Sequence, residues 1–452
     1  MVDNQPELGN ILAKMAALGA SEAFAKVLSE NDNTKNQVYF GPNFEVLHLL
    51  PHGDLVTDGV GDRTRYKAEL NLQWLNNELR PCRAPESKLI LYPQYPEVRF
   101  SGFLRGCDGA PAKHMRPRSV GYTIPRRILM LAVNHAKGEI YAYLAVDKGR
   151  LYRELEEQLP HCERRGVFHE ITRMLPIRVR DSRDELLVKL LQVHRKGWIV
   201  SKRLDRDGNT LACLAPNCGG LTLEAELDIR PNSRSEPDYL GWEVKQHSVI
   251  SFEGLRERLS NRGAAITLMT PEPRGGVYVE QGVERFVRRY GYADRTGRKD
   301  RLNFGGKHVF GVPCNLTGLT LLTMGFDHKK GTMRGDGSIA LVREGEKEVA
   351  AEWPFSDLLT HWSRKHAKAA YVPSMVLKTP RLKYRYANIV RLGEGTDFLR
   401  FLKAVHAGVV FYDPGIKLEN ASGQSKVKRR SQFRILSGDL ACLYGSMTTS
   451  GL

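Results

Sequence analysis

Hydrophobic residues near the start of the chain recur every three or four positions, which is the spacing of one face of an α-helix. They are Leu8, Ile11, Leu12, Met15, Leu18, Phe24, Val27 and Leu28. Turn-forming polar residues from Asn31 to Asn36 close the segment. The pattern predicts an amphipathic helix within residues 8 to 29.

Three later segments combine β-branched, aromatic and aliphatic residues, which is the composition of strands. They run from Glu97 to Leu104, from Arg126 to Asn134 and from Glu139 to Val146. Residues 135 to 138 separate the last two segments and end in a glycine, so we predict a β-hairpin there. A further helix is predicted from Asp184 to Val193, ending before Gly197 and Trp198.

The chain has 452 residues, more than one domain normally contains. Between residues 165 and 195 a short helical connector leads into the segment that is richest in chemically active side chains. We therefore predict an α+β accessory domain over residues 1–180 and a larger domain over residues 181–452, both within the α/β class.

Composition and local patterns exclude several kinds of protein. Apolar residues make up 41% and charged residues 26% of the chain, as in ordinary globular proteins. The longest apolar run, near residues 128 to 133, is far shorter than the ~20 residues that cross a bilayer. The first residues are polar and acidic, unlike a secretory signal, so we expect a cytoplasmic protein.

The chain has seven cysteines, of which only Cys213 and Cys218 lie close together in the sequence. No second pair of Cys or His follows at the spacing of a zinc ribbon. We therefore expect buried or incidental thiols, with neither a structural zinc nor a disulfide framework.

The charge of the chain points to a class of partner. Its 68 Lys and Arg residues against 51 Asp and Glu residues give a net charge of +17. Such an excess attracts polyanions and yields affinity through the release of counterions. Nucleic acid is therefore the first candidate partner, and a merely basic cytosolic protein is the alternative. The basic loop from Arg105 to Arg118 allows the same two interpretations, a phosphate contact or a solvated loop.

The segment from Gly219 to His247 holds the densest set of useful side chains. A helical stretch follows Thr222, residues 231 to 233 form a turn, and Tyr239 to Gln246 have the composition of a strand. The local order is therefore helix, turn and strand.

Three polar side chains can converge on this predicted strand. Glu243 and Lys245 are two residues apart and project from the same face, and Asp238 stands at the start. Two carboxylates can hold a hard divalent ion, and a nearby ammonium can orient water or stabilise developing charge. The set suits hydrolysis of a phosphodiester. The alternative is an ordinary Glu–Lys ion pair that faces solvent at the edge of a strand.

The preceding helix offers a further carboxylate. Glu224 and Glu226 both lie within reach of the site in sequence. Two residues along a helix correspond to about 200° of rotation, so only one of these glutamates can face the site.

These residues resemble the PD-(D/E)XK nuclease superfamily, in particular the MvaI/BcnI-like type II restriction endonucleases, which are related to the mismatch-repair nickase MutH. The likeness rests on LTLEAELDI, PNS and EPDYLGWEVK within residues 221–245. It continues in RLNFGG, YDPGIKLE and KRRSQFR and covers residues 190–452.

The resemblance implies a three-layer core, with a mixed β-sheet between helices, and Mg²⁺-dependent cleavage of double-stranded DNA, Mn²⁺ being a substitute ion. It implies that Asp238 and Glu243 bind the metal, that Lys245 is the catalytic lysine and that Glu224 is the helix glutamate. Residues 1–180 have no counterpart in compact members of the family. We expect this domain to extend target recognition or to restrain the nuclease, and a purely structural extension is the alternative.

Two long stretches without acidic residues suggest a DNA-binding surface. Leu358 to Gly393 contain eight Lys or Arg residues with aromatic residues between them, and Asn420 to Gly438 contain five. By resemblance, KRRSQFR corresponds to the recognition segment of the family. The candidate DNA-binding residues are Arg301, Asn303, His308, His366, Lys426, Lys428, Arg429, Arg430, Gln432 and Arg434. Sequence alone does not separate phosphate contacts from base contacts among them.

The resulting prediction is a Mg²⁺-dependent DNA endonuclease of restriction or phage defence. A MutH-like nicking enzyme of DNA repair and a non-catalytic DNA sensor on a nuclease scaffold are the alternatives. The sequence shows neither a phosphate-binding GxxxxGK[ST] motif nor a glycine-rich loop of the kind methyltransferases use. Protection of host DNA would therefore need a separately encoded methyltransferase or another defence protein.

Overall fold

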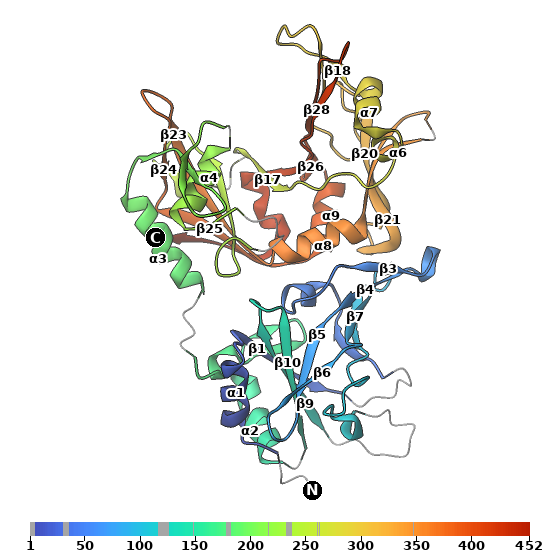
Figure 1. The fold of residues 1–452 in the computed structure, drawn as a ribbon, viewed down its shortest axis with the longest axis vertical. Coiled ribbons are helices and arrows are strands. Elements are labelled where there is room, and N and C mark those ends of the chain that lie inside the picture. The colour runs from blue at the N-terminus through green and yellow to red at the C-terminus, as the bar shows by residue number, and fades with distance from the viewer. Residues whose placement is uncertain are drawn as a thin grey trace. The chain divides into compact units, whose positions relative to one another are not determined.

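The computed structural model describes residues 5–29, 36–115, 126–147, 149–177, 182–215, 217–231, 237–259, 261, 263–346 and 348–452. The chain divides into two compact units, Met1–Asp181 and Ser182–Leu452. Figure 1 shows the elements of each unit. None of the described helices is both long and apolar enough to cross a membrane.

The N-terminal unit is built on two sheets. The first has the order β11-β12-β1-β9-β10-β5-β6 and the second the order β2-β8-β7-β4-β3. The strands are β1 (Glu22–Leu28), β2 (Val38–Gly41), β3 (Val56–Asp58), β4 (Arg65–Glu69), β5 (Asn71–Leu75), β6 (Pro81–Ala84), β7 (Lys88–Tyr92), β8 (Glu97–Ser101), β9 (Arg127–Asn134), β10 (Glu139–Val146), β11 (Arg164–Arg165) and β12 (Phe168–Glu170). Helices α1 (Leu8–Ala17) and α2 (Arg150–Gln158) pack on the first sheet in one apolar cluster. The predicted hairpin is confirmed by the pairing of β9 with β10.

The predicted helix over residues 8–29 is wrong in its second half. Helix α1 ends at Ala17, and Glu22–Leu28 form strand β1, which pairs with β9 along its whole length. Gly19 has a φ of +87°, a conformation that ends helices readily because glycine has no Cβ. Phe24 is therefore buried in a sheet, although its spacing also fits a helix.

The C-terminal unit contains a mixed central sheet. Its order is β13-β24-β23-β25-β30, and β16 pairs with β23 in parallel, which confirms the predicted mixed sheet. Its strands are β13 (Ile199–Val200), β16 (Glu243–Ser248), β23 (Lys368–Leu377), β24 (Lys383–Tyr386), β25 (Ile389–Thr396) and β30 (Tyr444–Gly451). Helices α3 (Ser182–Arg195) and α4 (Cys218–Glu226) pack on one face in a single apolar cluster. The 3₁₀ segment η7 (Ser437–Leu443) lies on the other face. Arg391 on β25 donates a hydrogen bond to Ser437 O there, at 2.7 Å.

The remaining elements form small sheets and helices. The other sheets of this unit are β14-β15, β17-β29-β26, β18-β19-β27-β28 and β20-β21-β22. Their strands are β14 (Lys202–Leu204), β15 (Thr210–Ala212), β17 (Ala265–Met269), β18 (Tyr292–Ala293), β19 (Arg301–Gly305), β20 (Leu319–Asp327), β21 (Thr332–Arg343), β22 (Val349–Pro354), β26 (Phe411–Tyr412), β27 (Gly415–Glu419), β28 (Lys426–Lys428) and β29 (Phe433–Leu436). The other helices are α5 (Leu255–Arg258), α6 (Val277–Glu280), α7 (Gly282–Tyr290), α8 (Phe355–Lys365) and α9 (Phe398–His406).

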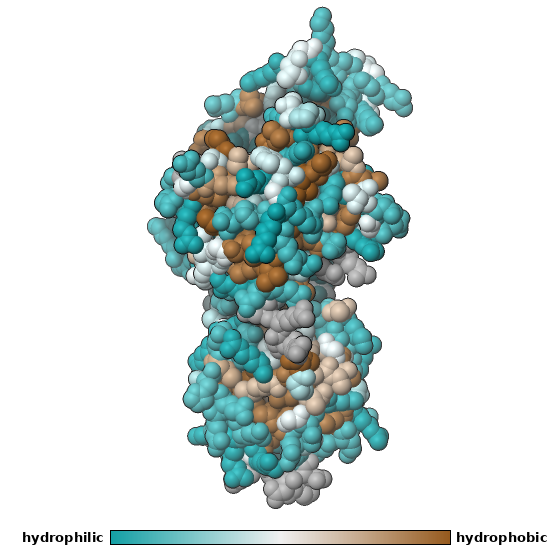
Figure 2. All heavy atoms as spheres, turned by 90° about the vertical axis from the view of Figure 1, so that its left-hand side faces the viewer, coloured by the Kyte–Doolittle hydropathy of each residue, from teal (hydrophilic) through white to brown (hydrophobic). Residues whose placement is uncertain are grey.

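The C-terminal unit has two arms that rise on either side of α8 and α9 (Figure 1). We call them the α4 arm, with α3, α4, β16, β23, β24 and β25, and the β28 arm, with α7, β18, β19, β27 and β28. Polar side chains cover most of the face seen in Figure 2, with apolar side chains in separate patches. Leu214 and Ile250 are among the most exposed large apolar residues of this unit, at 88% and 94%.

Candidate active site

Helix α4 is fixed closely against the central sheet. Tyr386 donates from its hydroxyl to Gly219 O at 2.8 Å. Thr222 Oγ1 accepts from Lys202 N at 3.1 Å. A Cβ at position 219 would lie 2.7 Å from Gln246 Oε1 and 3.1 Å from Tyr384 Cε1, so the side chains of the sheet pack closely against this turn of α4. These contacts fix the distance between helix α4 and strand β16.

A tight two-residue turn leads into β16. Tyr239 and Trp242 exchange backbone hydrogen bonds of 2.9 and 2.8 Å, and Leu240 and Gly241 between them have φ values of +48° and +83°. The strand predicted from Tyr239 therefore begins only at Glu243. The turn reverses the chain, which brings Asp238 back beside the first residues of β16. Of the turn predicted at residues 231–233, residues 232 and 233 lie outside the described residues.

The structure brings the three polar side chains of the predicted set together. Lys245 Nζ donates to Glu243 Oε1 at 2.8 Å. Asp238 Oδ2 accepts from Val244 N at 2.9 Å. The second oxygen of Glu243, Oε2, is buried and has no hydrogen-bond partner among the described residues. The cluster thus holds one buried acceptor that its own donors do not satisfy.

The electrostatic balance of the cluster is unequal. Burial and the charge of Glu243 raise the pKa of Asp238 to about 7. Burial alone would raise the pKa of Glu243, but Lys245 and other nearby cations outweigh it and lower this pKa. Burial likewise opposes the charge of Lys245, but Glu243 outweighs it and raises the pKa of the lysine. Lys245 therefore keeps its proton, whereas burial and the charge of Glu243 outweigh the effect of the nearby lysines on the pKa of Asp238.

The two helix glutamates have different surroundings. Burial raises the pKa of Glu224. The charge of Lys245 lowers this pKa and the charge of Glu243 raises it, so Glu224 lies close to the cluster. Glu226 forms ion pairs with Lys196 and Lys202 at 2.5 and 2.6 Å. Of the two candidates, Glu224 is the one beside Asp238, Glu243 and Lys245.

One residue near the site escaped the sequence-based prediction. Lys365, the last residue of α8, places Nζ 3.8 Å from Glu243 Oε2. Strands β16 and β23 pair in parallel from Glu243 and Ala369 onward, so both strands start at the same edge and the α8–β23 junction lies there too. No local signal marks Lys365, because the pairing joins segments more than 100 residues apart. The only hint in the sequence is its place in the basic stretch from Leu358 to Gly393.

The donor set fits a divalent ion. Among the described residues no group of three or more His, Cys, Asp and Glu side chains could hold a metal by itself. Mg²⁺, however, is commonly held by one or two carboxylates, with water and substrate phosphates completing the shell. Asp238 and Glu243 supply two carboxylates, and Glu243 Oε2 is a buried oxygen without a hydrogen bond.

The expectation of free thiols at Cys213 and Cys218 is wrong. The two residues form a disulfide between the end of β15 and the start of α4. Five residues of separation and a turn at residue 217 allow their Cα atoms to approach to 5.8 Å. Cys82, Cys107, Cys162, Cys314 and Cys442 are free.

The predicted DNA-binding residues on β19 are engaged within the protein. Arg301 Nε donates to Asp294 Oδ2 at 2.7 Å, and Asn303 Nδ2 donates to the same oxygen at 2.8 Å. The side chain of Arg301 is 10% exposed. Both residues therefore shape the β18–β19 hairpin in this structure, and a DNA contact would need new partners for them.

The recognition candidates after residue 420 differ in exposure and in ion pairing. Lys426, Arg429 and Arg430 are exposed on the β28 arm. Lys428 is also exposed, but it pairs with Glu419 at 2.9 Å. Arg434 pairs with Asp413 at 2.5 Å.

Gln432, His308 and His366 do not fit a direct DNA contact in this structure, because all three are buried. Gln432 Oε1 accepts from Arg430 Nε at 3.3 Å, and His308 Nε2 lies 2.8 Å from Thr317 Oγ1. His366 Nε2 lies 3.2 Å from Leu268 O.

The aromatic residues of the first basic stretch, Trp362, Tyr371, Tyr384 and Tyr386, are buried as well. They belong to the core and offer no stacking surface for bases. Aromatic residues fill cores more often than they line surfaces, and sequence spacing does not separate the two uses.

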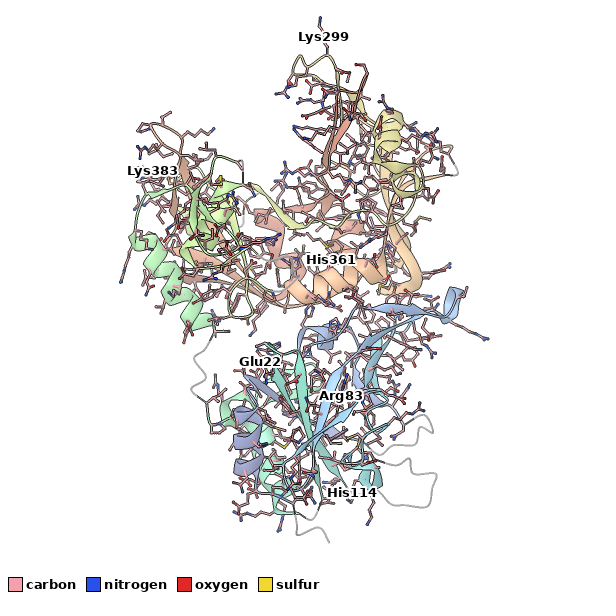
Figure 3. The ribbon with its side chains drawn as sticks, in the orientation of Figure 1. Glu22, Arg83, His114, Lys299, His361 and Lys383 are labelled. Carbon is pink, nitrogen blue, oxygen red and sulfur yellow. A yellow bond between two sulfur atoms is a disulfide. The ribbon has the colours of Figure 1, made fainter. Side chains whose placement is uncertain are left out.

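Basic residues lie on both arms of the C-terminal unit. Figure 3 places Lys383 on the α4 arm, Lys299 at the tip of the β28 arm and His361 on α8 between them. Lys383 belongs to β24, and Lys299 to the turn between β18 and β19. The two arms thus carry positive charge on either side of α8.

Known proteins resemble the C-terminal unit. The solved structure of restriction endonuclease MvaI with its cognate DNA substrate is 17% identical, with a TM-score of 0.44 over 60% of this chain and 98% of that chain. MvaI in the absence of DNA is 18% identical, with a TM-score of 0.33 over 60% of this chain and 97% of that chain. No curated protein matches the chain. The model of the MvaI/BcnI restriction endonuclease family matches residues 187–444, more than half of the chain. The chain therefore belongs to the MvaI/BcnI restriction endonuclease family.

Proposed function

We propose that this restriction endonuclease hydrolyses phosphodiester bonds of double-stranded DNA with Mg²⁺, for which Mn²⁺ can substitute, and that it serves restriction or phage defence. The observation that carries the proposal is the buried cluster of Asp238, Glu243 and Lys245 with an oxygen that lacks a hydrogen bond. An ordinary surface ion pair would leave neither a buried unsatisfied oxygen nor a carboxyl whose pKa is raised to about 7.

Each residue of the cluster has a distinct role in this proposal. Asp238 and Glu243 would hold the ion, which supplies positive charge that polarises the scissile phosphate and acidifies water. Lys245 is held by Glu243 and keeps its proton, so it acts as a fixed cation beside the developing negative charge. Glu224, whose pKa burial raises, is suited to accept a hydrogen bond from water at the site.

The surface supports a duplex bound between the two arms. Exposed basic residues such as Lys426 and Arg429 lie on the β28 arm, and Lys383 lies on the α4 arm. Phosphate contacts from both arms would fix the register of the duplex, and side chains on the β28 arm would read base edges.

Supercoiled plasmid DNA provides the decisive test. Incubation with Mg²⁺ should give linear products, and incubation with EDTA should give none. Accumulation of open circles that never become linear would identify a nicking enzyme of the MutH kind. Failure to cleave any DNA at any Mg²⁺ or Mn²⁺ concentration would contradict the proposal, and sequencing of the product ends would reveal the target.

A defence role requires that host DNA be protected. We propose that a separately encoded methyltransferase or another defence protein provides this protection. Plasmids prepared with and without methylation of the cleaved sequence should differ in cleavage. Equal cleavage of both would contradict protection by methylation.

We propose an accessory role in target recognition or restraint for residues 1–181. The unit has its own apolar cluster, which includes Met15, Met130 and Leu155. In its basic loop, Arg105 pairs with Glu86 at 3.3 Å, and residues 116–118 lie outside the described part of the chain. A chain lacking this unit should cleave with altered site choice or reduced discrimination. Unchanged site choice and rate would favour a purely structural extension.

A further inference from the structure

A second lysine faces the carboxylate cluster from a part of the chain remote in sequence. Lys365 Nζ lies 3.8 Å from Glu243 Oε2, the oxygen that has no hydrogen-bond partner in the described structure. The charge of Lys365 also acts on Glu224 and Asp238. Its ammonium is therefore directed at the centre of the cluster.

The fold holds Lys365 in this place. It is the last residue of α8, and His366 directly after it stacks on Trp362 with ring centroids 4.1 Å apart. His366 Nε2 lies 3.2 Å from Leu268 O on β17. This buried anchor fixes the backbone from which Lys365 projects.

The two lysines of the cluster are not equivalent. Lys245 donates to Glu243 at 2.8 Å, and its side chain is 16% exposed. Lys365 is 31% exposed, and 3.8 Å is too long for a hydrogen bond. Glu243 therefore has one hydrogen-bonded cation, Lys245, and a second cation, Lys365, that acts on it by charge alone. Lys365 is thus a partly exposed cation beside the cluster whose hydrogen-bonding capacity Glu243 does not use.

We propose that Lys365 is a second active-site lysine that donates to an oxygen of the DNA phosphate at this site and that offsets the charge of Glu243 while DNA is absent. The inference rests on the proposed function of the cluster. An ammonium beside a phosphate makes a charge-assisted hydrogen bond, which is stronger than the long contact with Glu243. Lys365 would then exchange one anionic partner for another when the duplex binds.

The proposal predicts effects of opposite sign on ion binding and on DNA binding. Lys365→Met removes a positive charge beside the ion-binding carboxylates, so Ca²⁺ should bind the DNA-free protein roughly three- to ten-fold more tightly. The same variant loses a phosphate contact, so duplex affinity in Ca²⁺ should fall roughly three- to ten-fold. Single-turnover cleavage in Mg²⁺ should slow by about 10²-fold.

The full-length protein allows matched controls. Lys365→Arg keeps the charge and a donor and should recover most of the duplex affinity. Lys330→Met removes an exposed lysine from the turn between β20 and β21 and should change neither Ca²⁺ nor duplex affinity. Ca²⁺ binding would be measured by calorimetry, duplex binding by fluorescence anisotropy, and folding by thermal unfolding.

Two results would overturn the inference. Duplex affinity and cleavage in Lys365→Met equal to those of the unaltered protein would show that Lys365 touches no phosphate. Weaker binding of both Ca²⁺ and duplex would assign Lys365 a supporting role in the site. If the unaltered protein cleaved no DNA, the proposed function would fail, whereas the two binding measurements would still test Lys365.

Discussion

Two clusters of charged side chains lie on opposite sides of α4, and they differ in how completely their charges are matched. On one side each carboxylate oxygen of Glu226 meets a lysine, Lys196 at 2.5 Å and Lys202 at 2.6 Å. On the other side Glu224 joins Asp238 and Glu243, and Oε2 of Glu243 has no hydrogen-bond partner in the described structure. Both carboxylate oxygens of Glu226 are paired within the first cluster, whereas the second cluster leaves one carboxylate oxygen without a hydrogen-bond partner among the described residues.

The pKa values record the same difference. Burial would raise the pKa of Glu226, but hydrogen bonds from Lys196 and Lys202 outweigh it and lower the pKa. Burial raises the pKa of Glu224 despite Lys245. The pKa values of two glutamates that are two residues apart on one helix are therefore shifted in opposite directions. Breaking a matched buried pair destabilises the fold, whereas an unmatched buried set costs stability and makes this side of α4 the candidate site for a charged ligand.

The largest loss of DNA cleavage is expected when one member of the unmatched cluster is removed. Asp238→Ala or Lys245→Ala should lower DNA cleavage by about 10³-fold or more, because in the proposed function Asp238 holds the ion and Lys245 lies beside the developing negative charge. Duplex binding should persist. Lys202→Ala, which alters the matched cluster, is the control and should retain cleavage. Gel assays of plasmid cleavage measure the effect, and full cleavage by Lys245→Ala would remove this lysine from the site.

The two helix glutamates allow a paired test with smaller effects. Glu224→Gln should lower cleavage by about 10²-fold and leave the free energy of unfolding unchanged or higher, since it removes an unmatched buried charge. Glu226→Gln should lower the free energy of unfolding by about 1–2 kcal/mol, a modest value because its lysines are partly exposed. Its cleavage should stay within about two-fold. Urea denaturation and cleavage assays on both variants measure these effects. Equal effects of the two substitutions on stability and on cleavage would contradict different roles for Glu224 and Glu226.

The unmatched cluster should also make stability depend on pH. Folding raises the pKa of the Asp238 carboxyl from 3.8 to about 7. Between these two pH values the folded protein therefore binds more protons than the unfolded chain. Stability from this group is therefore present below about pH 4 and is lost as pH rises through about 7. Between pH 5 and 8 in EDTA, this amounts to about 2–3 kcal/mol.

Asp238→Asn isolates this contribution. The variant cannot ionise at this position, so its free energy of unfolding should fall less between pH 5 and 8 than that of the unaltered protein. Mg²⁺ should reduce the difference, because it favours the ionised carboxylate. Denaturation curves at several pH values provide the measurement. Identical slopes for both proteins would show that Asp238 titrates normally.

Local sequence patterns predicted those parts of the site that depend on neighbouring residues. Glu243 and Lys245 share a face because strands alternate with a period of two, and their contact at 2.8 Å needs no distant partner. The opposition of Glu224 and Glu226 likewise follows from the helical repeat, although only the structure shows which one faces the site.

Features that depend on distant pairing could not be predicted in this way. Lys365 reaches the site through the parallel pairing of β16 with β23, and no spacing rule links it to Glu243. Phe24 satisfies both a helical and a strand pattern, and pairing with β9 decides between them. Burial of His366 and Gln432 is also a tertiary property. Sequence composition marked the surrounding stretch as basic without distinguishing exposed from buried members.

The smallest expected effects concern the basic residues of β28, where matched and unmatched charges recur at the surface. Lys428 pairs with Glu419 at 2.9 Å, whereas Lys426, two residues earlier, has no ion pair among the described residues. Lys426→Ala should therefore lower duplex affinity more than Lys428→Ala, by about two- to five-fold on all sequences. A lysine that contacts a phosphate also contributes about −0.9 to the slope of log K against log salt.

Base reading should have a different signature from phosphate binding. Arg430→Ala should relax discrimination between target and altered sequences by about 1–3 kcal/mol if the guanidinium reads a guanine edge. Arg434 is held by Asp413, so Arg434→Ala combines any loss of discrimination with a disturbed loop. Binding titrations at several salt concentrations, on target and altered duplexes, separate the two kinds of contact. Equal, sequence-independent losses from all four substitutions would refute a recognition role for these arginines and would leave β28 as a surface that binds phosphates alone.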